Sequence, residues 1–143
     1  ILRNPTSIGS RYKTLSYTDN VVALRAAVSS GFGDAFFFSL DGNLSCATAA
    51  NVFVQLGRNI VTPPVNDGAL PGVMRNWILA QGRIGGFAVS ERSVSRSDVL
   101  AADRVFLTNS LRLFQPVLGF ECTHYEPSLP DGCEALRSQL TGR

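Results

Sequence analysis

The dipeptide Asp41-Gly42 restricts the possible folds of this chain more than any other local feature. It separates an aromatic-rich run, residues 34–40, from a second apolar stretch that begins at Leu44. Asp-Gly between two such runs is a strong signal for a β-hairpin, because glycine accepts the positive φ that a tight turn requires. The chain is therefore expected to contain a β-sheet, which argues against a helical bundle.

Further short strands are predicted wherever apolar runs are bounded by turn residues. Residues 51–56 and 60–62 form a second predicted pair around Gly57-Arg58-Asn59, and Pro63-Pro64 then forces a turn. Two more strands are predicted at residues 87–94 and 104–107.

Four helices are predicted between and after these strands. Ser16 and Asp19 form a capping box for the first, and Pro71 suits the first position of the second. The third is opened by Ser97. The predicted helices cover residues 16–30, 71–81, 97–102 and 133–140. Short mixed strands with separate helices are typical of an α/β (α+β) domain.

The whole chain has the size of one domain, with 143 residues of which 45% are hydrophobic. Its net charge is +2 and its arginines are scattered, so nucleic acid is not an expected partner. No apolar stretch reaches the roughly 20 residues that a membrane-crossing helix needs. A soluble protein without a membrane partner is therefore expected.

Cys46, Cys122 and Cys133 are an odd number of cysteines in no metal-ligand spacing. Such a set favours free thiols in a reducing cytoplasm over a disulfide framework, and no metal site is expected. A disulfide between Cys122 and Cys133 stays open as an alternative. The chain starts at Ile1 without a Met or a signal-like region, which we interpret as a chain cut from a longer parent.

Lys13 is the only lysine, since twelve of the 13 Lys and Arg residues are arginine. Arginine stays protonated and cannot act as an amine nucleophile, whereas a buried lysine can lose its proton and form an imine. Lys13 is therefore a candidate for covalent chemistry with a carbonyl compound. The alternative is a solvated surface residue in an arginine-rich composition.

Three further segments carry candidate binding groups. Residues 70–75 place a glycine at a helix start, where backbone N–H groups and the helix dipole attract phosphate. Residues 107–110 end a strand with small polar side chains that could complete an anion shell, and residues 46–53 would let a flat ligand approach the backbone. Each segment alone is also compatible with an ordinary turn or with packing. His124, the only histidine, has no ligand set nearby and is interpreted as a structural or surface residue.

Taken in order, these segments resemble the class IV aminotransferase-like family, the fold-type-IV pyridoxal-phosphate enzymes. The resemblance rests on Asn51-Val52-Phe53, Thr62 and Leu70-Pro71-Gly72-Val73-Met74-Arg75 at the family spacing. Residues 12–20 look like the segment around the family's Schiff-base lysine. Thr108-Asn109-Ser110-Leu111-Arg112 and Gln115-Pro116-Val117 are most similar to 4-amino-4-deoxychorismate lyase, since transaminases usually show a Gly-Thr-Ala-like segment there.

The resemblance implies a barrel-like sheet with flanking helices, pyridoxal 5'-phosphate as cofactor, and a C-terminal cofactor-bearing domain, residues 1–143, whose N-terminal domain is absent. Lys13 would be the catalytic residue. The implied cofactor-binding residues are Lys13, Cys46, Asn51, Gly72, Val73, Met74, Asn109 and Ser110. Cys46 stands where the family has an acid, and a neutral thiol would not hold the proton of the pyridine nitrogen by charge.

The implied reaction converts 4-amino-4-deoxychorismate to p-aminobenzoate and pyruvate in folate biosynthesis, in a homodimer acting on a small molecule. Two alternatives stay open. One is a D-amino-acid or branched-chain aminotransferase, and the other is a degenerate protein that binds pyridoxal phosphate without catalysis.

Overall fold

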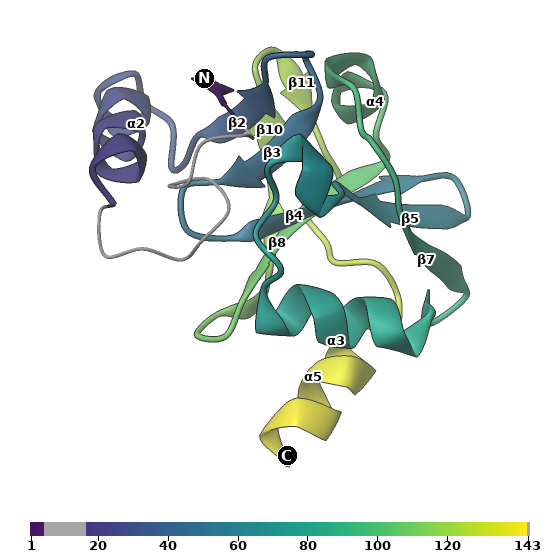
Figure 1. The fold of residues 1–143 in the computed structure, drawn as a ribbon. Coiled ribbons are helices and arrows are strands. Elements are labelled where there is room, and N and C mark those ends of the chain that lie inside the picture. Colours follow the sequence, from purple (N-terminus) through teal and green to yellow (C-terminus); the bar gives the residue numbers. More distant parts are fainter. Residues whose placement is uncertain (5–16, 143) are drawn as a thin grey trace.

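The computed structural model describes residues 1–4 and 17–142, and it confirms a mixed α/β fold in which the strands curl into half a barrel (Figure 1). Lys13 and Ser16 lie outside the described residues. The predicted hairpin is confirmed, because β2 (Phe36–Ser39) and β3 (Leu44–Ala47) pair antiparallel and Gly42 has a φ of 82°. A short strand, β1 (Leu2–Arg3), pairs with β2 in parallel.

A sheet of six strands, in the order β6-β7-β5-β4-β8-β9, forms the centre of the domain. The strands are β4 (Asn51–Leu56), β5 (Asn59–Thr62), β6 (Arg83–Ile84), β7 (Phe87–Glu91), β8 (Arg104–Asn109) and β9 (Leu113–Val117). All neighbours are antiparallel except β5 and β7, which run parallel with helix α3 (Val73–Gln81) in the crossover between them. A separate small hairpin consists of β10 (Gly119–Phe120) and β11 (Thr123–His124).

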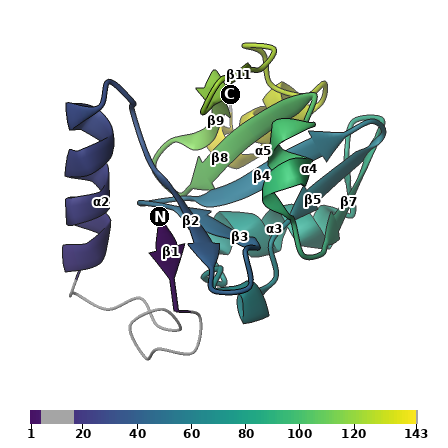
Figure 2. The ribbon, with the colours of Figure 1, turned by 90° about the horizontal axis from the view of Figure 1, so that it is seen from above.

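The four predicted helices are confirmed in position. They are α2 (Thr18–Ser29), α3, α4 (Arg96–Leu100) and α5 (Cys133–Thr141), and a 3-10 turn, η1 (Val65–Asp67), follows the two prolines. Figure 2 shows α2 standing at the side of the domain, beside the sheet of β1, β2 and β3.

The predicted starts of three helices are wrong. Tyr17, and not Ser16, is the N-cap residue of α2, and it provides no side-chain cap. Pro71 is not the first helical residue of α3, because Gly72 follows it with an extended backbone, φ −63° and ψ 147°, and is itself the N-cap. For α4 the cap is Ser95, whose hydroxyl accepts the amide hydrogen of Asp98 at 3.1 Å.

The strand predictions are right in place, and the one for residues 51–56 is also right in length, but others differ in length. The strand predicted for residues 87–94 ends at Glu91, and the one predicted for 104–107 continues to Asn109. Strands β1, β6, β9, β10 and β11 have no counterpart among the predictions. Pro116 lies in β9, an edge strand of the sheet, which is where proline is tolerated.

Alternate residues of β4 face two hydrophobic clusters. Val52 and Val54 pack in the cluster that contains Phe36 and Leu44, whereas Phe53 packs in the cluster that contains Met74 and Ile78 of α3. Met74 and Ile78 therefore fix one face of α3 against the sheet. The helix starts at the end of the sheet where β4 begins.

Helix α5 is joined to the β6–β7 turn by contact between two backbone segments. A Cβ atom on Gly85 would lie 2.3 Å from the Asp131 carbonyl oxygen, and one on Gly132 would lie 2.4 Å from the Gly85 nitrogen. Both glycines also have positive φ, 53° for Gly85 and 97° for Gly132. A side chain at either position would separate the two segments.

The thiols of Cys122, which is exposed, and Cys133, which is buried, are both free, so the alternative of a disulfide between them is wrong. Among the helices that the structure describes, none combines the length and the apolar character needed to span a bilayer.

Candidate functional site

The start of α3 offers backbone donors to an anion. Its N-cap, Gly72, has no side chain, and the described part of the chain provides neither a side-chain cap nor an acidic residue in the first turn. The first amides of a helix have no acceptor within the helix, and the helix dipole favours negative charge beside them. Val73 is 77% exposed, whereas Met74 is buried against the sheet. This end of α3 is therefore both anchored and open to solvent.

Asn51, the first residue of β4, holds the segment that leads into α3. Its side-chain amide donates to the Leu70 carbonyl at 2.8 Å. Its Oδ1 atom lies only 2.2 Å from the place that a Cβ atom on Gly72 would occupy. Since the backbone conformation of Gly72 is open to any residue, the glycine is required by the close approach of Asn51.

The turn after β8 lies beside the start of β4. Asn109 donates from Nδ2 to the Ala49 carbonyl at 3.2 Å, and its Oδ1 accepts the amides of Leu111 and Arg112 at 3.0 and 2.8 Å. Ser110 is exposed in this turn. Asn109 thus fixes the turn to the β3–β4 connection, and Ser110 is exposed beside it.

The β-ladder also brings Thr108 opposite Asn51. The Thr108 hydroxyl is buried and has no hydrogen-bond partner among the described residues. Buried hydroxyl groups normally have a partner, so this end of β8 has spare capacity for a polar contact.

Cys46 lies in β3, directly opposite Phe37, and is 5% exposed. It packs with Phe37 and with Ala23 of α2, in a cluster separate from the two larger ones. The β3–β4 turn that follows is tied to α2 by a hydrogen bond from Asn20 to the Thr48 carbonyl. Cys46 therefore lies near Asn51 in sequence, but its side chain belongs to the α2 side of the domain.

Of the predicted site residues, the structure thus brings together Asn51, Gly72, Val73, Met74, Asn109 and Ser110 at one end of the central sheet, and it places Cys46 beside α2. Lys13, the residue predicted to be catalytic, lies outside the described residues.

One pair beside this site was not predicted as functional. Arg75 is 2% exposed and contacts the Glu91 carboxylate at the end of β7. Arg75 was recognisable only as the basic position of a sequence pattern. Nothing in the local sequence marks Glu91 as the partner of Arg75, because Glu91 lies 16 residues further along the chain, in strand β7.

The groups whose pKa is clearly shifted lie outside the candidate site. Burial raises the pKa of the Cys133 thiol to about 12, so that this group remains a neutral thiol and a poor nucleophile. Burial also raises the pKa of Tyr125 to about 12, and the Tyr125 hydroxyl donates to the Val99 carbonyl at 2.7 Å. His124 is exposed in β11, as expected for a surface residue.

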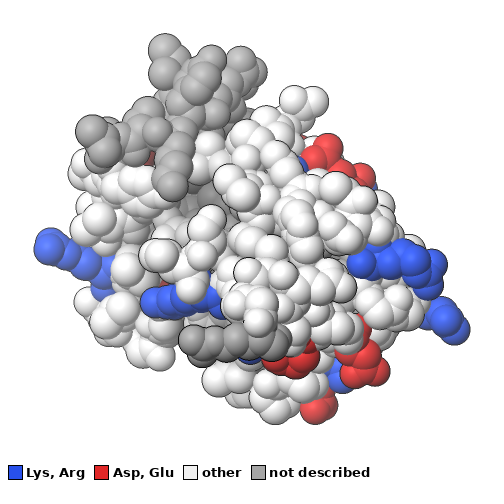
Figure 3. Space-filling view, turned by 90° about the horizontal axis from the view of Figure 1, so that it is seen from below, with Lys and Arg blue, Asp and Glu red and all other residues white. Residues whose placement is uncertain are grey.

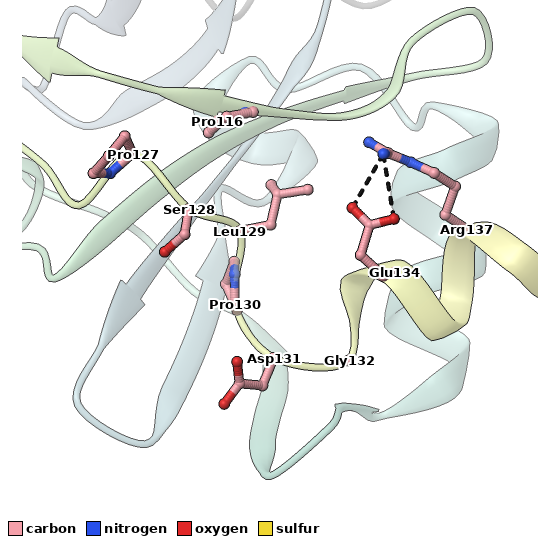
Figure 4. Close-up of a pocket in the computed structure, with 9 residues that line it drawn as sticks. All are labelled: Pro116, Pro127, Ser128, Leu129, Pro130, Asp131, Gly132, Glu134 and Arg137. Atoms are coloured by element: carbon pink, nitrogen blue, oxygen red, sulfur yellow. Dashed lines mark hydrogen bonds and ion pairs between the residues drawn. The ribbon is translucent and has the colours of Figure 1, made fainter.

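A cavity of about 590 Å³ lies between β9 and the start of α5 (Figure 4). Two of its charged groups already have partners, because Arg137 pairs with Glu134 at 3.1 Å and donates to the Phe114 carbonyl at 2.8 Å. The lining residues are Pro116, Pro127, Ser128, Leu129, Pro130, Asp131, Gly132, Glu134 and Arg137, which include no predicted site residue. The start of α3, with its uncapped amides, is the stronger candidate for a site.

On the face shown in Figure 3, arginine side chains lie in several separate places, with acidic side chains beside some of them. Among the described residues, no three or more His, Cys, Asp and Glu side chains are grouped so that they could hold a metal ion.

Comparisons with known proteins consistently point to one family. The family model described as "Amino-transferase class IV" matches residues 1–120. The branched-chain-amino-acid aminotransferase 2 of Arabidopsis thaliana is 31% identical over 144 aligned positions, which cover 96% of this chain and 37% of the relative. The aminodeoxychorismate lyase of Bacillus subtilis is 28% identical over 137 positions, which cover 96% of this chain and 47% of the relative.

Among solved structures, a Legionella pneumophila protein assigned to 4-amino-4-deoxychorismate lyase matches with a TM-score of 0.90 and 31% identity. The match covers 97% of this chain and 53% of that one. The chain therefore spans about half the length, or less, of the proteins that it matches.

Proposed function

Because the chain belongs to the class IV aminotransferase family, whose members are pyridoxal-phosphate-dependent enzymes, we propose that it is the cofactor-bearing part of a lyase. The proposed reaction converts 4-amino-4-deoxychorismate to p-aminobenzoate and pyruvate. The substrate is a small molecule, and the active form that we propose is a homodimer.

The observation that carries the choice of reaction is the Asn109 side chain. It makes three hydrogen bonds that shape the turn of residues 109–112 and tie it to Ala49. The Gly-Thr-Ala-like segment of the transaminases has no side chain that could do this at the first position. The likeness to the Legionella protein and to the Bacillus lyase supports the same choice.

The residues at the start of α3 suit the phosphate group of the cofactor. We propose that the amides of Val73 and Met74 hold it, together with Asn109 or Ser110 from the neighbouring turn. The absence of a side-chain cap and of an acid from the described first turn keeps these amides available. Asn51 and Gly72 act by fixing the direction of the helix start, as their contact indicates.

The bound cofactor supplies an aldehyde that reacts with amines and a ring that withdraws electrons. Lys13 would hold the cofactor between turnovers. It would then take the proton from the substrate carbon that carries the nitrogen, and assist the departure of pyruvate by giving up a proton. Arginine could not replace it in either role, because its guanidinium stays protonated.

Cys46, whose side chain packs beside α2, stands at the sequence position of the family's acid, and a neutral thiol in that role could not hold the proton of the ring nitrogen by charge. We propose that a lyase tolerates this better than a transaminase does, because formation of the aromatic product drives the elimination. Replacing Cys46 by glutamate tests this point. An unchanged rate of p-aminobenzoate formation would show that electron withdrawal was not limiting.

The second candidate is a branched-chain-type aminotransferase, which the likeness to the Arabidopsis enzyme favours. The two reactions are separated by parallel assays of the protein with pyridoxal phosphate. One assay follows p-aminobenzoate from 4-amino-4-deoxychorismate, and the other follows transfer from a branched-chain amino acid to 2-oxoglutarate.

The lyase proposal predicts product in the first assay alone. It also predicts a loss of at least about 100-fold in Lys13→Arg, the lower end of what general acid–base groups contribute. The exposed residue Cys122 offers a control, and Cys122→Ser should be as active as the parent. Activity in the second assay alone would establish an aminotransferase. Cofactor binding without either activity would establish the non-catalytic alternative.

A further inference from the structure

We propose that the ion pair between Arg75 and Glu91 is a positioning device that sets the affinity of the α3 start for a phosphate group. This inference rests on the proposed function, since it concerns the same cofactor. Neither residue is proposed to touch the cofactor. Their role is to hold the amide-bearing turn of α3 in the orientation in which it binds an anion.

Arg75 joins the first turn of α3 to the ends of two strands. Its Nη2 atom donates to the Pro63 carbonyl, directly after β5, at 2.8 Å and also contacts the Glu91 carboxylate at the end of β7. Its Nη1 atom donates to Asn76 Oδ1 at 3.2 Å. Because β5 and β7 are the parallel pair, a single side chain clamps the helix to the same end of both strands.

The hydrogen bond from Arg75 to the Pro63 carbonyl links the two ends of the connection between β5 and α3. Asn51 holds the same connection near its other end, through the Leu70 carbonyl at 2.8 Å. The two contacts come from different elements, one from β4 and one from α3 itself. Together they leave the first turn of α3 little freedom to tilt.

The charges explain why Glu91 is needed. A cation in the first turn of a helix opposes the helix dipole, and a buried guanidinium without a partner is costly. Arg75 is 2% exposed, and its Nε atom has no partner among the described residues, so the pairing with Glu91 depends on the Nη2 atom. Glu91 balances the charge from a neighbouring strand. An acid within the turn would instead compete with phosphate for the helix amides.

The test compares Glu91→Gln with Glu121→Gln in the full protein. Both changes remove one carboxylate charge from an arginine pair, and the two side chains are similarly exposed, at 43% and 38%. The Arg96–Glu121 pair joins α4 to the β10–β11 turn and has no contact with α3. Dissociation constants are measured for pyridoxal phosphate and for pyridoxal, which lacks the phosphate, from the fluorescence of Trp77 in α3.

Glu91→Gln should weaken binding of pyridoxal phosphate by about 3- to 10-fold, the size expected from a helix-terminus interaction, and change pyridoxal binding less than about twofold. Glu121→Gln should change neither. Hydrogen exchange of the peptide that contains residues 72–76 should accelerate in Glu91→Gln before any cofactor is added. If Glu91→Gln does not fold, Glu91→Asp keeps the charge, shortens the reach and should show the same selective loss.

Equal weakening of both ligands would overturn the inference, because a general loosening of the fold acts on both alike. Unchanged exchange of residues 72–76 would overturn it as well. If the parent protein binds pyridoxal phosphate no better than pyridoxal, the proposed function itself fails. That outcome is distinct, since it appears before any variant is made.

Discussion

Replacing Gly72 by alanine should disturb the start of α3 through one contact. The backbone of Gly72, with φ −63° and ψ 147°, is open to alanine, so no backbone strain is expected. The new Cβ atom would, however, lie 2.2 Å from Asn51 Oδ1 and 3.4 Å from Asn51 Cγ. Asn51 has to rotate away, and its hydrogen bond to the Leu70 carbonyl is lost.

The magnitude follows from two opposing effects. Leaving the buried Asn51 amide without a partner costs about 1–3 kcal/mol. Replacing a glycine at a compatible position stabilises the fold by about 0.4–1 kcal/mol, because the unfolded chain loses freedom. The free energy of unfolding should therefore fall by about 1–2 kcal/mol in Gly72→Ala.

The assay is urea unfolding of Gly72→Ala, Asn51→Ala and the double variant. If the clash with Asn51 is the cause, Gly72→Ala should stabilise the fold by about 0.4–1 kcal/mol once Asn51 is alanine, which corresponds to a coupling of about 1–3 kcal/mol. Gly33→Ala is the matched control, because nothing lies within 4 Å of its Cβ position and its φ is not positive. Additive costs in the double variant would refute the reasoning, and so would a Gly33→Ala change as large as that of Gly72→Ala.

Three other outcomes are expected. Asp34→Ala removes the acceptor of the Ala35 amide (2.7 Å), the Thr48 amide (3.2 Å) and the Thr48 hydroxyl (2.5 Å). Urea unfolding should show a loss of about 1–3 kcal/mol, and a loss below about 0.5 kcal/mol would contradict this account. Phe120→Ala removes a ring stacked on Phe36 at 5.3 Å, and since Phe120 is only partly buried we expect about 2 kcal/mol, less than the 3–5 of a full core site. Burial raises the pKa of Tyr125 from 10.0 to about 12, so the unfolded state loses this proton first and stability should fall as the pH rises through that interval. Tyr125→Phe should show a shallower fall between pH 10 and 12, and an identical fall would show that Tyr125 is not its source.

The sequence predicts the parts of the fold that depend on neighbouring residues. The Asp41-Gly42 hairpin and the β4–β5 pair follow from local turn chemistry, and so does the end of α3 at Gly82, which has a φ of 66°. Strand β9 could not be predicted in this way. It contains Pro116, and its place at the sheet edge depends on pairing with β8.

The candidate site also contains some features that depend on neighbouring residues and others that depend on distant elements. A glycine near a helix start and a polar turn could be predicted, because glycine and short polar side chains stand in sequence where those structures occur, although the helix begins two residues after the predicted Pro71. The contact between Asn51 and Gly72 and the pair of Arg75 with Glu91 could not, because each depends on how distant elements pack. The direction of the Cys46 side chain, toward Ala23 and Phe37, also depends on the register of β2 and β3.

The contact between Gly85 and Gly132 has a consequence for how the C-terminal helix can change over time. Contacts between side chains can be weakened or strengthened one methyl group at a time, and a loss on one side can be compensated on the other. Two backbones that touch allow no such gradation, since any side chain on either partner displaces the neighbouring segment. We therefore expect α5 to detach as one unit, and descendants of this chain to keep both glycines or to rebuild the whole C-terminal segment.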